Sequence, residues 1–176
     1  MLASDWSPDG ALLCVTRTDT LGSADIVFVS TSGNHEVHVF LDSPFNESNG
    51  VFSPDGRWLA YESNETGQSE IYIRPLPGPG NAVKVSDSGG TSPVWSSDGR
   101  EIYYVSGNNQ TMSARVTAGR SNIEVTSTAV LFTRTALMSE YDVFPDNKRF
   151  LVNRTIEPTE TDPVTLVINW TRKLKE

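Results

Sequence analysis

The sequence predicts an all-β fold built from four copies of one antiparallel unit, and three observations support this prediction. The motif Trp-Ser-Pro-Asp-Gly at residues 6–10 recurs in variant forms around Asp55, Asp98 and Asp146, so that with Asp9 the four aspartates are spaced by 46, 43 and 48 residues. Each copy is followed by short β-rich runs that polar, turn-forming connections separate. No window shows a 3.6-residue apolar period long enough for a helix. Repetition at this spacing is typical of a repeat architecture.

The residue types of the motif specify a tight turn between two antiparallel strands. Proline presets φ for a type I turn, aspartate suits the next position, and glycine adopts the positive φ that follows. Ser97 replaces proline in the third copy and Asn147 replaces glycine in the fourth, where asparagine tolerates positive φ well. A ring of carboxylates with a functional role is the alternative interpretation of the aspartates, and the turn role is preferred. The expected turn residues are Pro8, Asp9, Gly10, Pro54, Asp55, Gly56, Asp98, Gly99, Pro145, Asp146 and Asn147.

Four strands are expected in each complete copy. The first is a short strand that carries Trp6, Phe52, Trp95 or Val143. The strands that follow the turns are expected at Ala11–Arg17, Arg57–Ser63, Arg100–Ser106 and Lys148–Arg154. The next strands are expected at Asp25–Ser30, Glu70–Arg74, Thr111–Thr117 and Val164–Trp170, and the outer strands at Glu36–Leu41, Ala82–Val85 and Ile123–Phe132.

Four antiparallel strands every 43 to 48 residues are typical of a β-propeller blade. Both faces of the strand around Trp58 and Leu59 are partly apolar, as a sheet between two other sheets requires. A β-sandwich is the rival architecture, but it does not require one turn motif to recur at a fixed spacing. The expected blades span approximately residues 1–46, 47–91, 92–137 and 138–176.

Composition excludes several classes of function. The 14 Lys and Arg against 22 Asp and Glu give a net charge of −8 and a pI of about 4.7, which argues against binding to nucleic acid or to an anionic membrane. The apolar runs are too short for insertion into a membrane, and no signal peptide is recognisable at the N-terminus. Cys14 is the only cysteine, which excludes internal disulfides. Both a cytoplasmic and a periplasmic location remain open.

No catalytic, cofactor-binding or metal-binding residues are expected. The only histidines, His35 and His38, are three residues apart on an expected strand, point to opposite faces and are interpreted as solvated side chains. A Gly-x-Ser-x-Gly elbow, a P-loop and the kinase signatures are all missing from the sequence. The aromatic residues beside the turns are expected in the core; they are Trp6, Phe52, Trp95 and Phe144.

Two segments resemble a known family. Residues 51–63, followed by 69–73, and residues 93–105 are similar to the WD-repeat-like propeller unit of TolB-type proteins. The end of the chain, at residues 164–171, is similar to the C-termini of large bacterial proteins in which such a propeller follows a kinase or regulator domain. The resemblance implies a binding scaffold without a catalytic centre. Because such propellers usually have more than four blades, it also implies that this chain is the C-terminal part of a larger ring.

The expected function is therefore that of a non-enzymatic module for protein interaction or ligand sensing within a signalling protein. Its partner would be another protein, and exposed blade edges could also support self-association. The alternative is the accessory propeller that gates a serine peptidase of the prolyl-oligopeptidase type. A lyase propeller is a third possibility, but it would need inward-facing clusters of histidine.

Overall fold

The computed structural model describes residues 1–78, 80–119, 122–135 and 138–154, and within them the protein is all β. Three four-stranded antiparallel sheets and one two-stranded sheet follow one another in chain order. The first sheet contains β1 (Leu2–Trp6), β2 (Leu12–Thr18), β3 (Ala24–Ser30) and β4 (Val37–Leu41). The second contains β5 (Glu47–Phe52), β6 (Trp58–Ser63), β7 (Glu70–Pro75) and β8 (Val83–Lys84). The third contains β9 (Gly90–Trp95), β10 (Glu101–Ser106), β11 (Gln110–Ala118) and β12 (Ile123–Thr133). The fourth contains β13 (Met138–Val143) and β14 (Phe150–Arg154).

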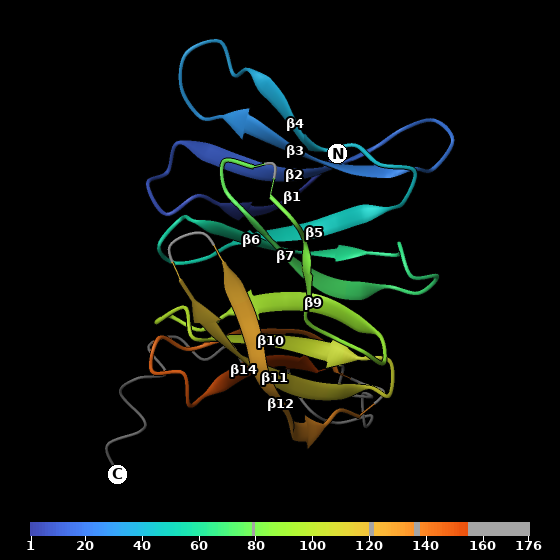
Figure 1. Cartoon of the computed structure of the whole chain (residues 1–176), viewed down its shortest axis with the longest axis vertical. Coiled ribbons are helices and arrows are strands. Elements are labelled where there is room, and N and C mark those ends of the chain that lie inside the picture. The colour runs from blue at the N-terminus through green and yellow to red at the C-terminus, as the bar shows by residue number, and fades with distance from the viewer. Residues whose placement is uncertain (79, 120–121, 136–137, 155–176) are drawn as a thin grey trace, which may run out of the picture.

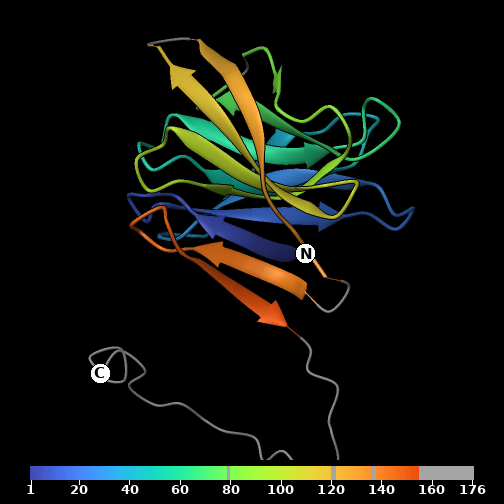
Figure 2. The same cartoon turned by 90° about the horizontal axis from the view of Figure 1, so that it is seen from below.

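Figure 1 shows the sheets stacked face to face along the long axis of the molecule, and we call them blades 1 to 4. Within each blade every strand pairs with the next strand in the sequence. Figure 2 views the stack from below and shows β13 and β14 as a separate hairpin. The predicted all-β fold with four-stranded antiparallel sheets is thus confirmed, whereas the strand predicted at Val164–Trp170 lies outside the described residues. In the described part of the chain, no helix has the length and apolar character that a membrane span requires.

The core lies between the blades and consists of two clusters. Between blades 1 and 2, the fully buried side chains of Cys14, Ile26 and Leu59 pack together with aromatic residues. Between blades 2 and 3, the buried side chains of Trp58 and Trp95 belong to a second cluster. Every residue of β6 is buried because this strand is covered on both faces, which explains why its sequence is apolar at successive positions.

Two of the aromatic residues predicted in the core are not buried. Phe52 and Trp95 are 6% and 8% exposed, but Trp6, the equivalent residue of blade 1, is 59% exposed. Each buried ring contacts the preceding blade: Phe52 lies 5.3 Å from Phe28 between ring centroids, and Trp95 Nε1 donates to the Val51 carbonyl (3.2 Å). Among the described residues, no blade lies on that side of blade 1. The prediction for Trp6 was therefore wrong.

Phe144 is half-buried rather than part of the core. The Arg149 guanidinium lies over its ring, 4.5 Å from the ring centroid. In blade 4 the motif has this phenylalanine where the other three copies have serine, so the aromatic side chain lies at the beginning of the turn. A cation therefore covers a ring that the sequence pattern had placed inside the protein.

Irregularities in the inner strands tie adjacent blades together. Asn49 in β5 and Ser92 in β9 have positive φ (51° and 55°) and lie where the register with the neighbouring strand shifts. The Asn49 amide donates to Thr16 Oγ1 (3.2 Å) and the Ser92 amide donates to Glu62 Oε1 (2.7 Å). Both acceptors lie on the second strand of the preceding blade, seven residues after the turn aspartate. Equivalent side chains thus form equivalent links between blades.

Candidate binding face at the repeated turns

The four repeated turns share one hydrogen-bond pattern. Gly10, Gly56 and Gly99 have φ of 72°, 69° and 68°, and Asn147 in the fourth turn has φ of 56°. In the first turn, Asp9 Oδ1 accepts hydrogen bonds from the Ser7 hydroxyl (2.6 Å) and from the Ala11 amide (3.0 Å). The equivalent bonds to Asp55 and Asp98 are present in the next two blades. In the fourth turn Asp146 accepts from the Lys148 and Arg149 amides.

These hydrogen bonds help to lower the pKa values of the four turn aspartates. The hydroxyl of the preceding serine and the backbone amide lower the pKa of Asp9 from its ordinary value of 3.8, and the same contacts lower the pKa of Asp98. Burial works in the opposite direction at Asp55, but the bonds from Ser53 and Arg57 outweigh it and the pKa is again lowered. At Asp146 the main cause is the Lys148 amide. One carboxylate oxygen of each aspartate is therefore used within its own turn.

We expect acid to destabilise the fold through these turns. A carboxyl group with a lowered pKa in the folded state contributes stability above its unfolded pKa and loses that contribution as the pH falls through the folded pKa. The turn aspartates should therefore contribute fully above about pH 5 and progressively less below about pH 4. Urea unfolding of the wild type and of Asp98→Asn at both pH values measures this contribution.

Burial raises the pKa of Asp5 and Glu47, so these groups respond to acid in the opposite sense. Both proteins contain them, and the quantity to compare is therefore the difference in unfolding free energy between wild type and Asp98→Asn. The stability gap between wild type and Asp98→Asn should shrink on acidification. A gap that stays constant from neutral pH to about pH 3 would contradict the assigned role of Asp98.

Turns of neighbouring blades lie against one another. A methyl group at Gly56 would lie 3.8 Å from Pro8 Cδ, and one at Gly99 would lie 3.6 Å from Pro54 Cδ. Between blades 3 and 4 a polar contact takes the place of this packing. The Ser97 amide donates to Asn147 Oδ1 (2.8 Å), and the Ser97 hydroxyl donates to the Pro145 carbonyl (2.8 Å). Ser97, which replaces proline, and Asn147, which replaces glycine, therefore contact each other.

Replacing Gly56 by valine should destabilise the protein by about 1–3 kcal/mol, because a β-branched residue is strained at positive φ. The added methyl groups would also press toward Pro8. Urea unfolding measures the loss. Gly56→Asn is the control, since Asn147 already occupies the same position in blade 4, and it should cost less than half as much. Equal midpoints for wild type and Gly56→Val would contradict a left-handed Gly56.

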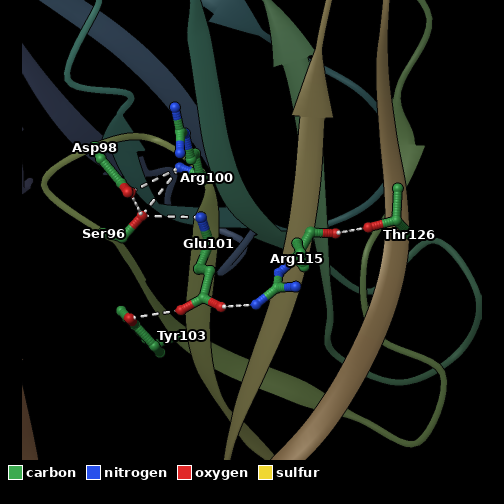
Figure 3. A network of polar contacts seen from close by, with 7 residues as sticks. All are labelled: Ser96, Asp98, Arg100, Glu101, Tyr103, Arg115 and Thr126. Carbon is green, nitrogen blue, oxygen red and sulfur yellow. Dashed lines mark hydrogen bonds and ion pairs between the residues drawn. The ribbon is translucent and has the colours of Figure 1, made fainter. Parts of the chain in front are cut away.

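A polar cleft of about 940 Å³ opens between blades 2 and 3 at this end of the sheets. Two of the turns form part of its wall, at Pro54 and Asp55 and at Ser97–Gly99. The other lining residues include Arg57, Trp58, Arg100, Glu101 and Arg115. Figure 3 shows part of this wall: Glu101 lies between Arg115 and Tyr103, and the Ser96 hydroxyl accepts from the Arg100 and Glu101 amides.

Two of the acidic side chains in the polar cleft, Asp55 and Glu101, are engaged by neighbouring side chains, and Asp98 accepts hydrogen bonds through Oδ1. Asp55 Oδ2 accepts from Arg57 Nε (2.8 Å), while Glu101 accepts from the Tyr103 hydroxyl (2.8 Å) and pairs with Arg115 (3.5 Å). The basic side chains retain donors: among the described residues the Arg100 guanidinium forms no ion pair within 4.0 Å. Trp58 is 3% exposed, and its Nε1 has no hydrogen-bond partner. Within the described part of the chain, the cleft thus presents the unpaired guanidinium of Arg100 and the unpaired indole N–H of Trp58.

A second, apolar cleft of about 560 Å³ lies between blades 1 and 2 at the same end. Leu12, Phe28, Phe40, Phe52 and Leu76 form its apolar wall. The Phe28 ring lies 4.7 Å from that of Phe40 and 5.3 Å from that of Phe52 between ring centroids. Residues 54, 55 and 57 line both clefts, so a narrow ridge around Arg57 separates them.

The histidines lie apart from the polar cleft. His35 directly follows the turn at residues 33–34 with φ of 54°, and its Nδ1 lies 3.0 Å from the Ser30 carbonyl oxygen, so the prediction that both histidines lie on one strand was wrong. The sequence Ser32-Gly33-Asn34 extends the connection by enough residues to exclude it from the sheet. His38 is exposed on β4 and borders the apolar cleft. In the described residues, no group of three or more His, Cys, Asp or Glu side chains is arranged to hold a metal ion.

The sequence reasoning identified the turn residues in the wall of the polar cleft but not its basic side chains. Arg57 and Arg100 both follow a turn aspartate by two residues, and Lys148 occupies the same place in blade 4. Alignment of the repeats could have revealed this basic position. Arg115 offers no such signal, because it reaches the cleft from β11 and its nearest partner, Glu101, is on the adjacent strand.

Comparisons with known proteins agree with this architecture. A candidate TolB protein from Agrobacterium tumefaciens is 21% identical, with a TM-score of 0.57 over 73% of this chain and 49% of that chain. TolB from Acinetobacter baumannii is 20% identical, with a TM-score of 0.58 over 84% of this chain and 42% of that one. The periplasmic gluconolactonase PpgL of Pseudomonas aeruginosa is 16% identical, with a TM-score of 0.57 over 84% and 48%.

At these identities the structural likeness shows the fold alone, and the chain spans less than half the length of each of the three proteins. The family match is more specific. Residues 1–166 match the family described as TolB beta propeller domain, which covers almost all of the sequence, including all four repeated turns. The chain therefore belongs to the TolB β-propeller domain family.

Proposed function

We propose that this chain is a non-catalytic interaction module that binds an acidic segment of a protein partner in the polar cleft between blades 2 and 3. The observation that carries the proposal is the Arg100 guanidinium, which lines the cleft and forms no ion pair within 4.0 Å among the described residues. Asp55 and Glu101 are bonded to neighbouring side chains, whereas Arg100 has its whole guanidinium available. A partner carboxylate would supply the missing acceptors through charge-assisted hydrogen bonds.

The rest of the cleft fits the same occupant. The Arg115 side chain is 67% exposed, and its Nη2 lies 3.5 Å from Glu101 Oε1. Part of its guanidinium therefore faces solvent. Trp58 adds an indole N–H that is buried without a partner, which costs free energy unless an acceptor approaches it. The net charge of −8 makes this concentration of donors a local feature, one that favours a specific contact over general attraction of anions.

The architecture supports a scaffold role. Stacked blades hold the turns in fixed positions, and a fixed set of connections at one end of rigid sheets suits binding. The chain spans less than half of the TolB structures that it matches, so we propose that it works within a larger propeller of a signalling protein. The alternative is the gating propeller of a serine peptidase. A hydrolase domain with a serine elbow in the same polypeptide would favour that alternative, and a kinase domain would favour signalling.

The test is an NMR titration of the labelled protein with the peptide acetyl-Glu-Gly-Glu-amide. Signals of the Trp58 indole N–H and of the Arg100 and Arg115 side chains should shift, and the glutamine analogue of the peptide should bind far more weakly. Arg100→Gln should weaken binding about tenfold, because it removes one charge-assisted interaction. Lys148→Gln removes an equally exposed cation outside the cleft and should leave binding unchanged. Equal effects of the two substitutions would contradict the proposed site.

Catalysis is tested separately, because solved structures with the same fold include gluconolactonases. We expect the purified chain to show no turnover of gluconolactone, and equally none of ester or peptide substrates. Turnover that a single substitution in this chain abolishes would overturn the non-catalytic assignment.

Self-association through the face that carries Trp6 stays a prediction, and a stable monomer of 19.3 kDa in light scattering would contradict it.

A further inference from the structure

The apolar cleft between blades 1 and 2 exposes part of a hydrophobic core. Leu12, Phe40 and Leu76 line the cleft, and all three are only partly buried where they pack against the core cluster of blades 1 and 2. Val39, on the same strand as Phe40, is 51% exposed and also borders the cleft. These residues come from both blades, so the cleft is a concave apolar surface rather than a single protruding side chain.

The equivalent junction between blades 2 and 3 has a larger side chain at the corresponding position. Trp58 and Leu12 occupy the same repeat position, three residues after the turn aspartate. The indole of Trp58 is buried at the junction of blades 2 and 3, where it packs with Trp95 in the core. The smaller side chain of Leu12 leaves the corresponding space at the junction of blades 1 and 2 open. A larger side chain at position 12 would therefore occupy part of the apolar cleft.

The charges on the rim of the apolar cleft are already paired. Asp9 Oδ1 accepts from the Ser7 hydroxyl and the Ala11 amide, and Asp55 is paired with Arg57 at 2.8 Å. His38 lies 3.7 Å from Glu36. Because the wall of this cleft is apolar and the rim carboxylates already accept hydrogen bonds within the protein, a neutral apolar group gains most from burial in this cleft.

We propose that the apolar cleft is a subsite for a neutral aromatic or leucine-sized side chain of the protein partner, with the acidic group of that partner in the polar cleft. This inference rests on the proposed function. The two clefts share Pro54, Asp55 and Arg57, so a segment that crosses this ridge contacts both. The recognised chemistry is then an apolar side chain a few residues from a carboxylate. Backbone carbonyl groups of the partner would face Arg57 at the ridge.

The experiment is fluorine NMR of the probe acetyl-para-fluorophenylalanine-amide in the presence of the full chain. The fluorine signal should shift and broaden as protein is added. Leu12→Trp, which places in blade 1 the residue found at the equivalent position of blade 2, fills part of the cleft and should weaken binding about tenfold. Leu21→Trp adds the same side chain at a loop position that is 93% exposed and should leave binding unchanged. Equal binding by wild type and Leu12→Trp, or no binding at all, would overturn the subsite.

Two further measurements keep the outcomes distinct. If Leu12→Trp fails to fold, Val39→Glu introduces a charge on the exposed wall and should weaken binding to a similar extent. Para-fluorotoluene carries the ring without the backbone and should bind more weakly than the amide probe; equally tight binding would assign the cleft to free apolar molecules and overturn the assignment to a polypeptide. Binding of acetyl-Glu-Gly-Glu-amide should be unaffected in Leu12→Trp, so failure of this subsite and failure of the polar cleft are separable.

Discussion

Replacing Glu62 by alanine should destabilise the protein by about 2–4 kcal/mol, because it removes the acceptor of several hydrogen bonds at a buried position. Glu62 is 7% exposed, and its Oε1 accepts from Asn49 Nδ2 (2.7 Å) and from the Ser92 amide (2.7 Å). Its Oε2 accepts from the Ser69 hydroxyl at 3.3 Å. One carboxylate thereby joins the inner strands of blades 2 and 3. Urea unfolding measures the loss.

Two matched variants separate the link from the general effect of truncation. Glu62→Gln keeps an acceptor oxygen in place and should cost only about 1 kcal/mol. Thr16→Val, at the equivalent position of blade 1, removes the single bond from the Asn49 amide and should cost about as much. If Glu62→Ala were no more costly than Thr16→Val, the carboxylate would not be holding the two blades together.

Replacing Gly50 by valine should destabilise the protein by about 3 kcal/mol through overpacking. A Cβ at Gly50 would lie 2.6 Å from Cys14 Sγ, 3.2 Å from Leu59 Cδ2 and 3.4 Å from Ile26 Cδ1. All three neighbours are fully buried, so none can move into solvent. Gly50 does not have positive φ, and valine favours strands, so the cost arises from packing alone.

A double-mutant cycle identifies the atom responsible. Gly50→Ala alone should be destabilising although alanine is favoured over glycine in a strand, and Cys14→Ala should remove most of that cost by deleting Sγ. Burial raises the pKa of the Cys14 thiol to about 11, so the thiol is neutral at pH 7 and its removal leaves no unpaired charge. Additive effects of the two substitutions, measured by urea unfolding, would show that Cys14 Sγ is not the obstacle.

The sequence was sufficient for the fold because its signals are local and repeated. A turn motif that recurs at a spacing of about 45 residues predicts one supersecondary unit per copy, and alternating β-rich runs supply the strands. The turns could be predicted in chemical detail, since proline, aspartate and glycine each have a conformational reason for their place. Neither inference depends on which residues from different blades meet.

The features that the sequence did not reveal are contacts between blades. Glu62 looks like an ordinary polar residue at the end of a strand, and only the positive φ of Ser92 on the next inner strand directs an amide toward it. Trp6 carries the same motif as Trp95, yet its burial depends on a neighbouring sheet that its own sequence does not specify. The clefts were missed for the same reason, because the residues that line each one come from more than one blade.

The contact between Ser97 and Asn147 has a consequence for exchanging blades within this protein. At the first two junctions a proline of one turn packs against a glycine of the next. At the third junction Ser97 has an amide hydrogen, which proline lacks, and donates it to the Asn147 side chain. A blade 4 moved to follow blade 1 or blade 2 would present Asn147 to a proline, and its side-chain oxygen would lose that donor. Compatibility between neighbours thus depends on two residues on different blades, and a change at only one of these positions forfeits the hydrogen bond between the turns.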